Sequence, residues 1–188
     1  HPGIAEFKGK NYFFYHNGAL PGGSGFTRSV CVEEFEYNED GSWPTLNMTV
    51  EGVNPVATLN PYERVEAETI SWSSGVRTEP CSQGGMNVCR IDDGDFIRVN
   101  NVDFGDGASS FTACVASDMY CSYIELRLDE LDGELIGRLP VPCTGGADKW
   151  VELSTKVSGA KGIHNLFFVF KGEAVGNLFK FDYWKFNK

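Results

Sequence analysis

Apolar and polar residues alternate along most of the chain, in short runs separated by Gly, Pro, Asn and Asp. Residues 4–16 alternate on both sides of Gly9-Lys10, which predicts two short strands joined by a turn. The runs at 26–37 and 46–50 predict two further strands. A unit of this size has difficulty burying a core by itself.

The remainder of the chain repeats this alternation, with turn residues every ~8–12 positions. No stretch shows a sustained helical period with caps, so helices are not expected. The sequence therefore predicts an all-β fold, a β-sandwich preceded by a short hairpin and strand pair. The strands predicted in this second part cover residues 64–70, 95–99, 110–116, 122–128, 150–157, 165–170 and 177–186.

A boundary is predicted between the two parts. Residues 54–61, NPVATLNP, contain two prolines and no charge, which is typical of a short stiff linker. The predicted organisation is residues 1–53, the linker 54–61 and a sandwich over 62–188.

Charge and hydropathy exclude two classes of partner. The 188 residues include 16 Lys and Arg against 26 Asp and Glu, a net charge of −10, and no basic block occurs. This composition argues against nucleic acid, whose binding relies on clustered Lys and Arg. Every apolar run is far shorter than the ~18 residues of a membrane helix, so no membrane partner is expected either.

The six cysteines leave two alternatives. They have no CxxC pair and no spacing typical of zinc. They are either buried thiols or form one or two local bridges, in which case proximity favours Cys81 with Cys89 and Cys114 with Cys121.

Three carboxylates form a candidate metal site. Glu66 and Glu68 lie on the same face of one predicted strand, about 7 Å apart. Asp182 interrupts the apolar C-terminal run LFKFDYWKF. If the first and last strands are neighbours, the three converge, and such hard oxygen ligands suit Ca²⁺. The alternative is a solvated strand face.

Longer motifs resemble two known families. Residues 62–188 contain, in order, YERVEAETISWSSGV, GGMNV, IDDGDFIRVNNVDFG, SFTACVAS and NLFKFDYWKF, and they resemble family 6 carbohydrate-binding modules. Residues 1–53, which begin HPGIAEFKGKNYFFYHNGALPGG, resemble the closing part of a family 43 glycoside hydrolase β-propeller. Those hydrolases often have a family 6 module behind the propeller.

The resemblance implies a jelly-roll sandwich from a secreted bacterial protein, extracellular or periplasmic, and a monomer. In the hydrolase family the catalytic carboxylates come from earlier blades, so no enzyme activity is expected here. His1 matches the family's HPG histidine, which lies near the catalytic centre.

The resemblance also implies ligands for one structural Ca²⁺. They are the two Glu of the E-A-E strand, a backbone carbonyl near the Gly-Gly turn and the Asp of the last strand. In this chain these positions are Glu66, Glu68, about Gly84, and Asp182.

The sugar site of the family lies at the loop end, where two aromatic side chains sandwich a sugar ring and an Asn binds its hydroxyls. This chain keeps the Asn, as Asn177, but has Arg90 and Ala147 at the aromatic positions. Trp72 and Tyr120 are candidate replacements, although Trp72 is equally expected to be buried, and Trp150 and Trp184 are expected in the core.

Three functions remain open at this point. The chain is a non-catalytic module for xylan-like or other β-linked plant polysaccharide, a part of a xylosidase or arabinofuranosidase-type hydrolase, or a structural sandwich that has lost sugar binding. If the loop-end site is used, the planar guanidinium of Arg90 favours a ligand with a uronic acid, because it pairs bidentately with a carboxylate. Binding in the family's second cleft, on the sandwich face, is the alternative.

Overall fold

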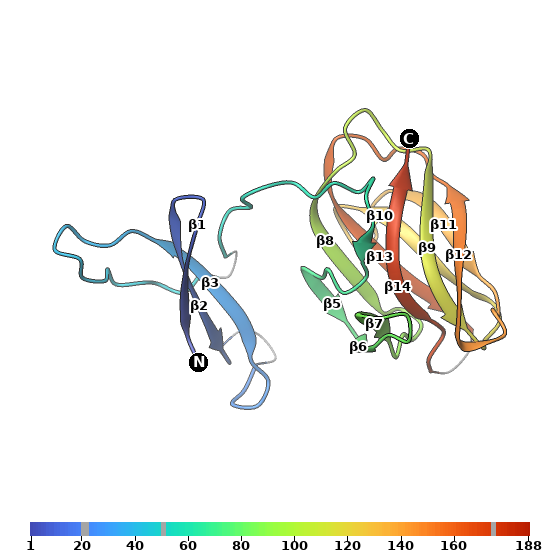
Figure 1. Ribbon diagram of the computed structural model, residues 1–188, viewed down its shortest axis with the longest axis horizontal. Helices are drawn as coiled ribbons and strands as arrows, with labels where there is room; N and C mark the ends of the chain where they lie inside the picture. The colour runs from blue at the N-terminus through green and yellow to red at the C-terminus, as the bar shows by residue number, and fades with distance from the viewer. Residues whose placement is uncertain (20–22, 50–51, 174–175) are drawn as a thin grey trace. The chain divides into compact units, whose positions relative to one another are not determined.

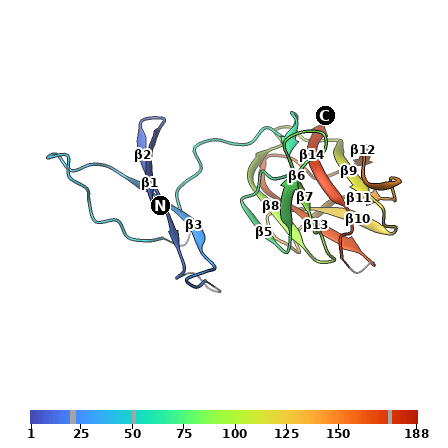
Figure 2. The same ribbon diagram turned by 60° about the horizontal axis from the view of Figure 1, so that its bottom comes forward.

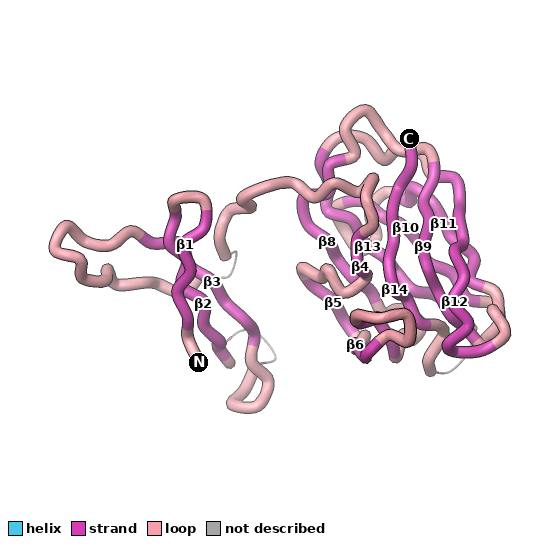
Figure 3. Tube along the Cα trace, in the orientation of Figure 1, coloured by secondary structure: helices cyan, strands magenta, loops and turns pink. Residues whose placement is uncertain are grey.

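The computed structural model describes residues 1–19, 23–49, 52–173 and 176–188. The chain forms two compact units, His1–Val56 and Ala57–Lys188. Throughout the described residues only strands and loops occur (Figure 3). None of those residues therefore belongs to a helix that could cross a membrane.

The first unit is built on a three-stranded antiparallel sheet, in the order β1 (Gly3–Phe7), β2 (Lys10–Asn17) and β3 (Ser29–Phe35) (Figure 1). The predicted hairpin is present, but its turn is Lys8-Gly9 rather than Gly9-Lys10, because Phe7 pairs with Lys10. Lys8 and Gly9 have φ of 52° and 75°. A two-residue turn with positive φ at both positions matches the twist of the flanking strands.

Aromatic rings and one buried acid hold this unit together. Trp43 stacks on Phe35 at 5.5 Å between ring centroids and meets the edge of Phe13 at 5.6 Å. The buried Glu33 accepts hydrogen bonds from the Tyr15 hydroxyl (3.0 Å) and the Thr49 backbone N–H (2.8 Å).

The strand predicted over 46–50 is wrong for residues 46–49, and Val50 lies outside the described residues. The contact with Glu33 gives the physical reason. The Thr49 backbone N–H, and its hydroxyl too, bond to a side-chain carboxylate instead of to a neighbouring strand.

The second unit is a sandwich of two sheets packed face to face, in which neighbouring strands are antiparallel (Figures 1 and 2). This confirms the predicted all-β sandwich. The five-stranded sheet has the order β11 (Leu135–Val141), β10 (Ser122–Leu128), β13 (Ile163–Gly172), β8 (Phe96–Asp103) and β5 (Trp72–Ser74). The six-stranded sheet has the order β12 (Gly146–Lys156), β9 (Ser110–Ser117), β14 (Lys180–Asn187), β7 (Met86–Cys89) and β6 (Arg77–Pro80), and β4 (Val65–Glu66) pairs with β14.

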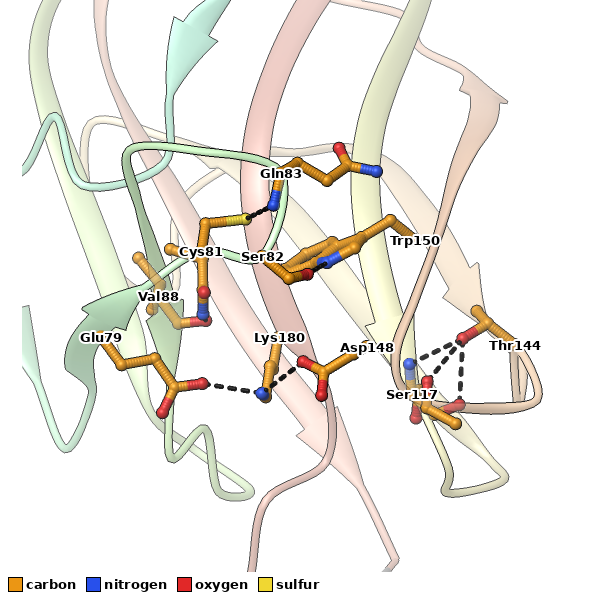
Figure 4. Close-up of polar contacts among 12 residues, drawn as sticks. Glu79, Cys81, Ser82, Gln83, Val88, Ser117, Thr144, Asp148, Trp150 and Lys180 are labelled. Atoms are coloured by element: carbon orange, nitrogen blue, oxygen red, sulfur yellow. Dashed lines mark hydrogen bonds and ion pairs between the residues drawn. The ribbon is translucent and has the colours of Figure 1, made fainter.

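Aromatic side chains dominate the core between the sheets. The ring of Phe168 contacts those of Phe111, Phe181 and Trp184 at centroid distances of 5.2–5.8 Å. Trp184 is fully buried, as predicted. Trp150 is only partly buried, and its indole N–H donates to Ser82 Oγ at 2.9 Å (Figure 4).

Strand β11 was not predicted, because Gly137 and Pro140 interrupt its pattern. The strand lies at a sheet edge, where Pro140 lacks an N–H without breaking a ladder. A Cβ at position 137 would lie 2.8 Å from Val157 Cγ1, so close packing requires the glycine. The strand predicted over 64–70 shrinks to β4, because the Thr69 N–H turns back to the Glu66 carbonyl.

All six cysteines are free thiols, but the alternative of buried thiols holds only for Cys81, Cys89 and Cys114; Cys31 and Cys143 are partly exposed and Cys121 is exposed. In the β6–β7 hairpin Arg77 is opposite Cys89, whereas Cys81 bonds to Gly85 at the other end. Cys114 is buried in the middle of β9, whereas Cys121 is exposed beyond its end. The two bridges that proximity in sequence favoured are therefore not formed.

The boundary between the units falls within the predicted linker 54–61. Leu59 already belongs to the second unit, since its N–H donates to the Asn101 carbonyl (2.8 Å) and its carbonyl accepts from the Asp103 N–H (2.9 Å).

His164 should make the stability of the second unit depend on pH. Its Nδ1 lies 2.8 Å from Asp129 Oδ2 and its Nε2 lies 2.8 Å from the Lys161 carbonyl. Both partners are acceptors, so the doubly protonated ring satisfies both. The hydrogen bond to Asp129 raises the pKa of His164. A pKa that is raised in the folded state adds stability at pH values below the pKa of the unfolded state. This added stability is lost as the pH rises through the pKa of the folded state.

We therefore expect His164→Gln to lower the free energy of unfolding most at about pH 5, and by progressively less toward about pH 8. Urea denaturation of both proteins across this range measures the difference. A difference that does not change with pH would contradict the assignment.

Candidate functional site

A cavity of about 280 Å³ opens at the end of the sandwich where β14 begins. Arg90, Ala147 and Asn177, the three positions to which the resemblance pointed, all line it. They come from the end of β7, the start of β12 and the segment before β14. The fold thus brings together residues that are far apart in the sequence.

Local backbone geometry positions two of these residues. Arg90 and Asn177 both have left-handed backbones, with φ of 53° and 48°. The Asn177 N–H donates to Asp92 Oδ1 at 3.0 Å, and the Leu178 N–H donates to the Ile91 carbonyl at 2.7 Å. The tight turn after Arg90 therefore holds the segment that carries Asn177. A left-handed conformation is uncommon for an Arg and is held in place by such neighbouring contacts.

A partly exposed ion-pair network lies beside these residues. Lys180 Nζ lies 2.8 Å from Glu79 Oε1 and 2.9 Å from Asp148 Oδ1 (Figure 4). The hydrogen bond with Lys180 lowers the pKa of Glu79, and the same bond raises the pKa of Lys180. Both groups therefore remain charged near neutral pH, and the positive charge of the lysine is already balanced by its acidic partners.

Two other charged residues of the cavity remain available to a ligand. Over the described ranges of the chain, the side chains of Arg90 and Asp118 make no ion pair or hydrogen bond, and both residues are exposed. One offers N–H donors and the other offers carboxylate acceptors. A sugar hydroxyl can use both, since it accepts and donates.

The sequence did not single out Lys180, Glu79, Asp148 or Asp118. Their association depends on strand order: β6, which carries Glu79, and β14, which carries Lys180, flank β7, and β9 lies between β14 and β12, which carries Asp148. The spacing of these residues along the chain contains no signal of it.

Neither of the two candidate replacement aromatics, Tyr120 and Trp72, forms a wall of the cavity. Neither Tyr120, which is 72% exposed, nor Trp72, which is 55% exposed, lines the cavity. Trp72 lies on β5, at the edge of the other sheet, opposite Arg98. Phe179 is the aromatic side chain among the described lining residues, and it is 2% exposed.

The outer face of the five-stranded sheet is the alternative site. Glu125 is buried there between Arg127 (2.8 Å) and Arg138 (2.6 Å). On the same sheet, Arg98 Nε and Asn100 Oδ1 are buried without a hydrogen-bond partner in the described part of the chain. This face therefore also has polar groups to offer, but its strongest ion pairs are already formed.

The first and last strands of the sandwich are neighbours, as the metal-site hypothesis requires. Glu66 of β4 pairs with Tyr183 of β14. Asp182 is the extra residue of a β-bulge, because Phe181 and Tyr183 oppose the consecutive residues Val115 and Cys114 of β9. The bulge breaks the alternation of β14, so that Phe181 and Trp184 both enter the core.

Buried carboxylate oxygens fit a cation at this place. Asp182 is 1% exposed, and neither of its oxygens has a hydrogen-bond partner among the residues the structure describes; the same holds for Glu68 Oε2. Burial raises the pKa of Asp182. Burial also raises the pKa of Glu68, with a further contribution from the charges of Glu66 and Asp182. Buried carboxylate oxygens with so few partners are costly unless a positive charge balances them or the carboxyl takes up a proton.

Arg64 supplies part of that charge. It forms a bidentate pair with Glu66 (2.8 and 2.9 Å), its Nη2 lies 3.5 Å from Asp182 Oδ2, and it stacks on the Tyr183 ring. Within the described residues, no three His, Cys, Asp or Glu side chains converge closely enough to hold a metal ion. Side chains alone therefore do not complete a ligand set.

Backbone carbonyl oxygens would have to complete the ligand set of a metal ion. The Gly84-Gly85 turn is tied to Cys81, whose N–H donates to the Gly85 carbonyl and whose carbonyl accepts from Gly84. The Cys81 thiol in turn interacts with Asp182. The turn that contains Gly84 is thus close to the two buried carboxylates, and the oxygen-rich donors fit Ca²⁺.

Comparison with known proteins agrees with this architecture. The chain is 45% identical to an arabinoxylan arabinofuranohydrolase of Bacillus subtilis (strain 168), over 98% of this chain and 38% of that protein. A crystal structure of a family 43 arabinoxylan arabinofuranohydrolase from Bacillus subtilis, in complex with cellotetraose, superposes with a TM-score of 0.93 and 44% identity, over 100% of this chain and 40% of that one. The chain thus spans well under half the length of these relatives.

The second unit by itself corresponds to a complete solved module. A family 6 module from Clostridium cellulolyticum, solved in complex with xylose, is covered completely by 69% of this chain, with 42% identity and a TM-score of 0.67. The model of the family described as carbohydrate binding module (family 6) matches residues 66–188. Through these residues, the chain belongs to the family 6 carbohydrate-binding modules.

Proposed function

We propose that the second unit binds xylan-like or other β-linked plant polysaccharide, without catalysing a reaction, through the cavity at the start of β14. The observation that carries the proposal is the convergence of Arg90, Asn177 and Asp118 in that cavity, with the charged side chains of Arg90 and Asp118 unpaired in the described structure. Support for the sugar class comes from the relatives, one named for arabinoxylan and one solved with xylose.

Recognition in this cavity relies on hydrogen bonds more than on stacking. Ala147 stands where an aromatic ring would cover one face of the sugar, and it provides little apolar area. The loss of such a contact weakens binding by about 1 kcal/mol. Arg90, Asp118 and the Asn177 amide offer donors and acceptors to the hydroxyls instead.

The charges of Arg90 and Asp118 act in opposite directions on an acidic sugar. The Arg90 guanidinium favours a uronic acid, since it can pair with the carboxylate in a bidentate geometry. The Asp118 carboxylate, on the same cavity, repels it. The preference of the site for decorated xylan therefore depends on which charge lies closer to the acid.

The wider biological context follows from the same proposal. The chain acts as a part of a larger secreted bacterial hydrolase of family 43, extracellular or periplasmic, and the second unit directs that hydrolase to polysaccharide. It acts as a monomer. One Ca²⁺ held by Glu66, Glu68, Asp182 and a backbone carbonyl near Gly84 stabilises the sandwich, and Glu66 must then exchange its pair with Arg64 for the metal.

The sugar site is tested by titrating xylo-oligosaccharides, with and without glucuronic acid, into the wild type, Arg90→Ala and Asn177→Ala. We expect each variant to bind several-fold more weakly, and Arg90→Ala to lose any preference for the acidic ligand. Asp118→Asn should shift the preference toward the acidic ligand, because it removes the repulsion. Trp72→Ala is the matched control, since it changes only the other sheet.

Unchanged binding in the Arg90 and Asn177 variants, with loss in Trp72→Ala, would move the site to the outer face of the five-stranded sheet. A wild type that binds no polysaccharide in affinity electrophoresis would favour a structural sandwich.

The metal is tested by thermal melting with and without EDTA. A ligand at a hundredfold excess over its Kd stabilises the native state by about 2.7 kcal/mol. We expect EDTA to lower the Tm of the wild type by several degrees and to leave that of Asp182→Ala unchanged. Asp182→Asn, which keeps the shape of the side chain, should behave like Asp182→Ala. Identical melting curves of the wild type with and without EDTA would contradict the proposed Ca²⁺ site.

Catalysis is tested with aryl-xyloside and aryl-arabinofuranoside substrates. We expect no turnover by the pure chain, because the resemblance places the catalytic carboxylates of the hydrolase family in blades outside it. Hydrolysis that a glycosidase inhibitor abolishes would show that the chain is an enzyme in its own right.

A further inference from the structure

Strand β12 leaves its ladder with β9 beside the cavity. Gly146 pairs with Ser117, and the next pair along the ladder is Val151 with Val115. One residue of β9 therefore lies opposite four residues of β12, so β12 contains three more residues than a regular ladder would hold there. Such an insertion is a long β-bulge, and bulges next to binding sites redirect side chains. We call residues 147–150 the bulge segment.

Two side chains of the bulge segment reach parts of the sheet with which β12 is not paired. Asp148 Oδ1 lies 2.9 Å from Lys180 Nζ on β14 (Figure 4). The Trp150 indole N–H donates to Ser82 Oγ at 2.9 Å, in the turn between β6 and β7. In the sheet, β9 lies between β12 and β14, and β7 and β6 lie on the far side of β14. The bulge segment therefore reaches across β9 and is anchored at two points beyond it.

This crossing forms one wall of the cavity. Ala147 of the bulge segment and Ala116 of β9, the residue that the segment spans, both line the cavity. Ala116 is fully buried, although the core position next to it belongs to Val115. Because side chains alternate along a strand, Ala116 faces away from the core, and the bulge segment lies where it can cover that side. Arg90 lines the cavity from the side of β7. The width of the cavity between Arg90 and Ala147 therefore depends on where the bulge segment is held.

We propose that Asp148 and Trp150 are positioning residues of the sugar site, because their contacts fix the bulge segment across β9 and so set the width of the cavity. The inference rests on the proposed function, since this width matters to recognition only if sugar binds there. The side chains of Asp148 and Lys180 are 68% and 25% exposed, so salt screens their ion pair. Binding of a neutral sugar should therefore weaken at high ionic strength.

Three variants test the anchors without altering a residue that lines the cavity. Asp148→Asn keeps the shape of the side chain and removes its charge, Trp150→Phe removes the indole N–H, and Ser82→Ala removes the acceptor of that N–H. In calorimetric titration with xylotetraose, with Ca²⁺ in excess throughout, we expect each variant to bind on the order of two- to five-fold more weakly than the wild type. Thermal melting should show a similar Tm for all of them.

Lys149→Ala is the matched control. Lys149 belongs to the same bulge segment and is exposed, and its side chain makes no hydrogen bond or ion pair with the residues that the structure describes. The control should therefore bind xylotetraose as tightly as the wild type does.

Three further measurements separate positioning from a general loss of stability. The losses of Trp150→Phe and Ser82→Ala should not add in the double variant, because both changes break the same hydrogen bond. High ionic strength should weaken binding by the wild type and change binding by Asp148→Asn much less. Amide hydrogen exchange of the bulge segment, measured without sugar, should be faster in the three variants than in the wild type and in Lys149→Ala.

Failure of the inference is distinct from failure of the proposed function. If the wild type binds xylotetraose and the three variants bind it equally well, the positioning role is overturned and the proposed function stands. Additive losses in the double variant would also overturn it. If the wild type binds no sugar, the proposed function and the role in recognition both fail, and faster exchange in the variants would then show only that the anchors hold the bulge segment.

Discussion

The second unit depends on a carboxylate that the fold buries. Asp182 is 1% exposed, and its two oxygens accept no hydrogen bond from the described residues. The free-energy cost of an unbalanced buried charge is a large share of the ~5–15 kcal/mol by which a domain is stable. An ionised Asp182 therefore needs a positive charge at β14, whether the Arg64 guanidinium, 3.5 Å from its Oδ2, or a bound cation provides it. Either one ties β4, the first strand of the sandwich, to β14, the last.

Strand β14 also links this constraint to the cavity lined by Arg90 and Asn177. The strand begins with Lys180, which Glu79 and Asp148 hold in the cavity, and its bulge at Asp182 follows two residues later. The same strand pairs with β9, β7 and β4, so its position is set from both sides. Balancing the charge of Asp182 therefore also fixes the strand from which the cavity is built. The stability of the unit and the shape of the cavity thus depend on the same strand.

Much of this architecture follows from alternation in the sequence. The predicted strands over 110–116 and 122–128 correspond closely to β9 and β10, because every second residue of each is apolar and packs in the core. Alternation fails where a special backbone replaces it. β11 contains Gly137 and Pro140, which an edge strand tolerates, and β14 has an acid in an apolar run because a bulge shifts its phase. Arg90, Ala147 and Asn177 were found through resemblance, whereas the pairing of Lys180 with Glu79 depends on strand order, which spacing along the chain does not contain.

The proposed function requires that sugar binds in the cavity at the start of β14. Backbone amide chemical shifts of the isotopically labelled chain, followed by NMR during titration with xylotetraose, test it most directly. We expect the largest shifts at Arg90, Asp118, Ala147 and Asn177. Shifts that instead gather at Trp72, Arg98 and Tyr123, on the five-stranded sheet, would contradict it.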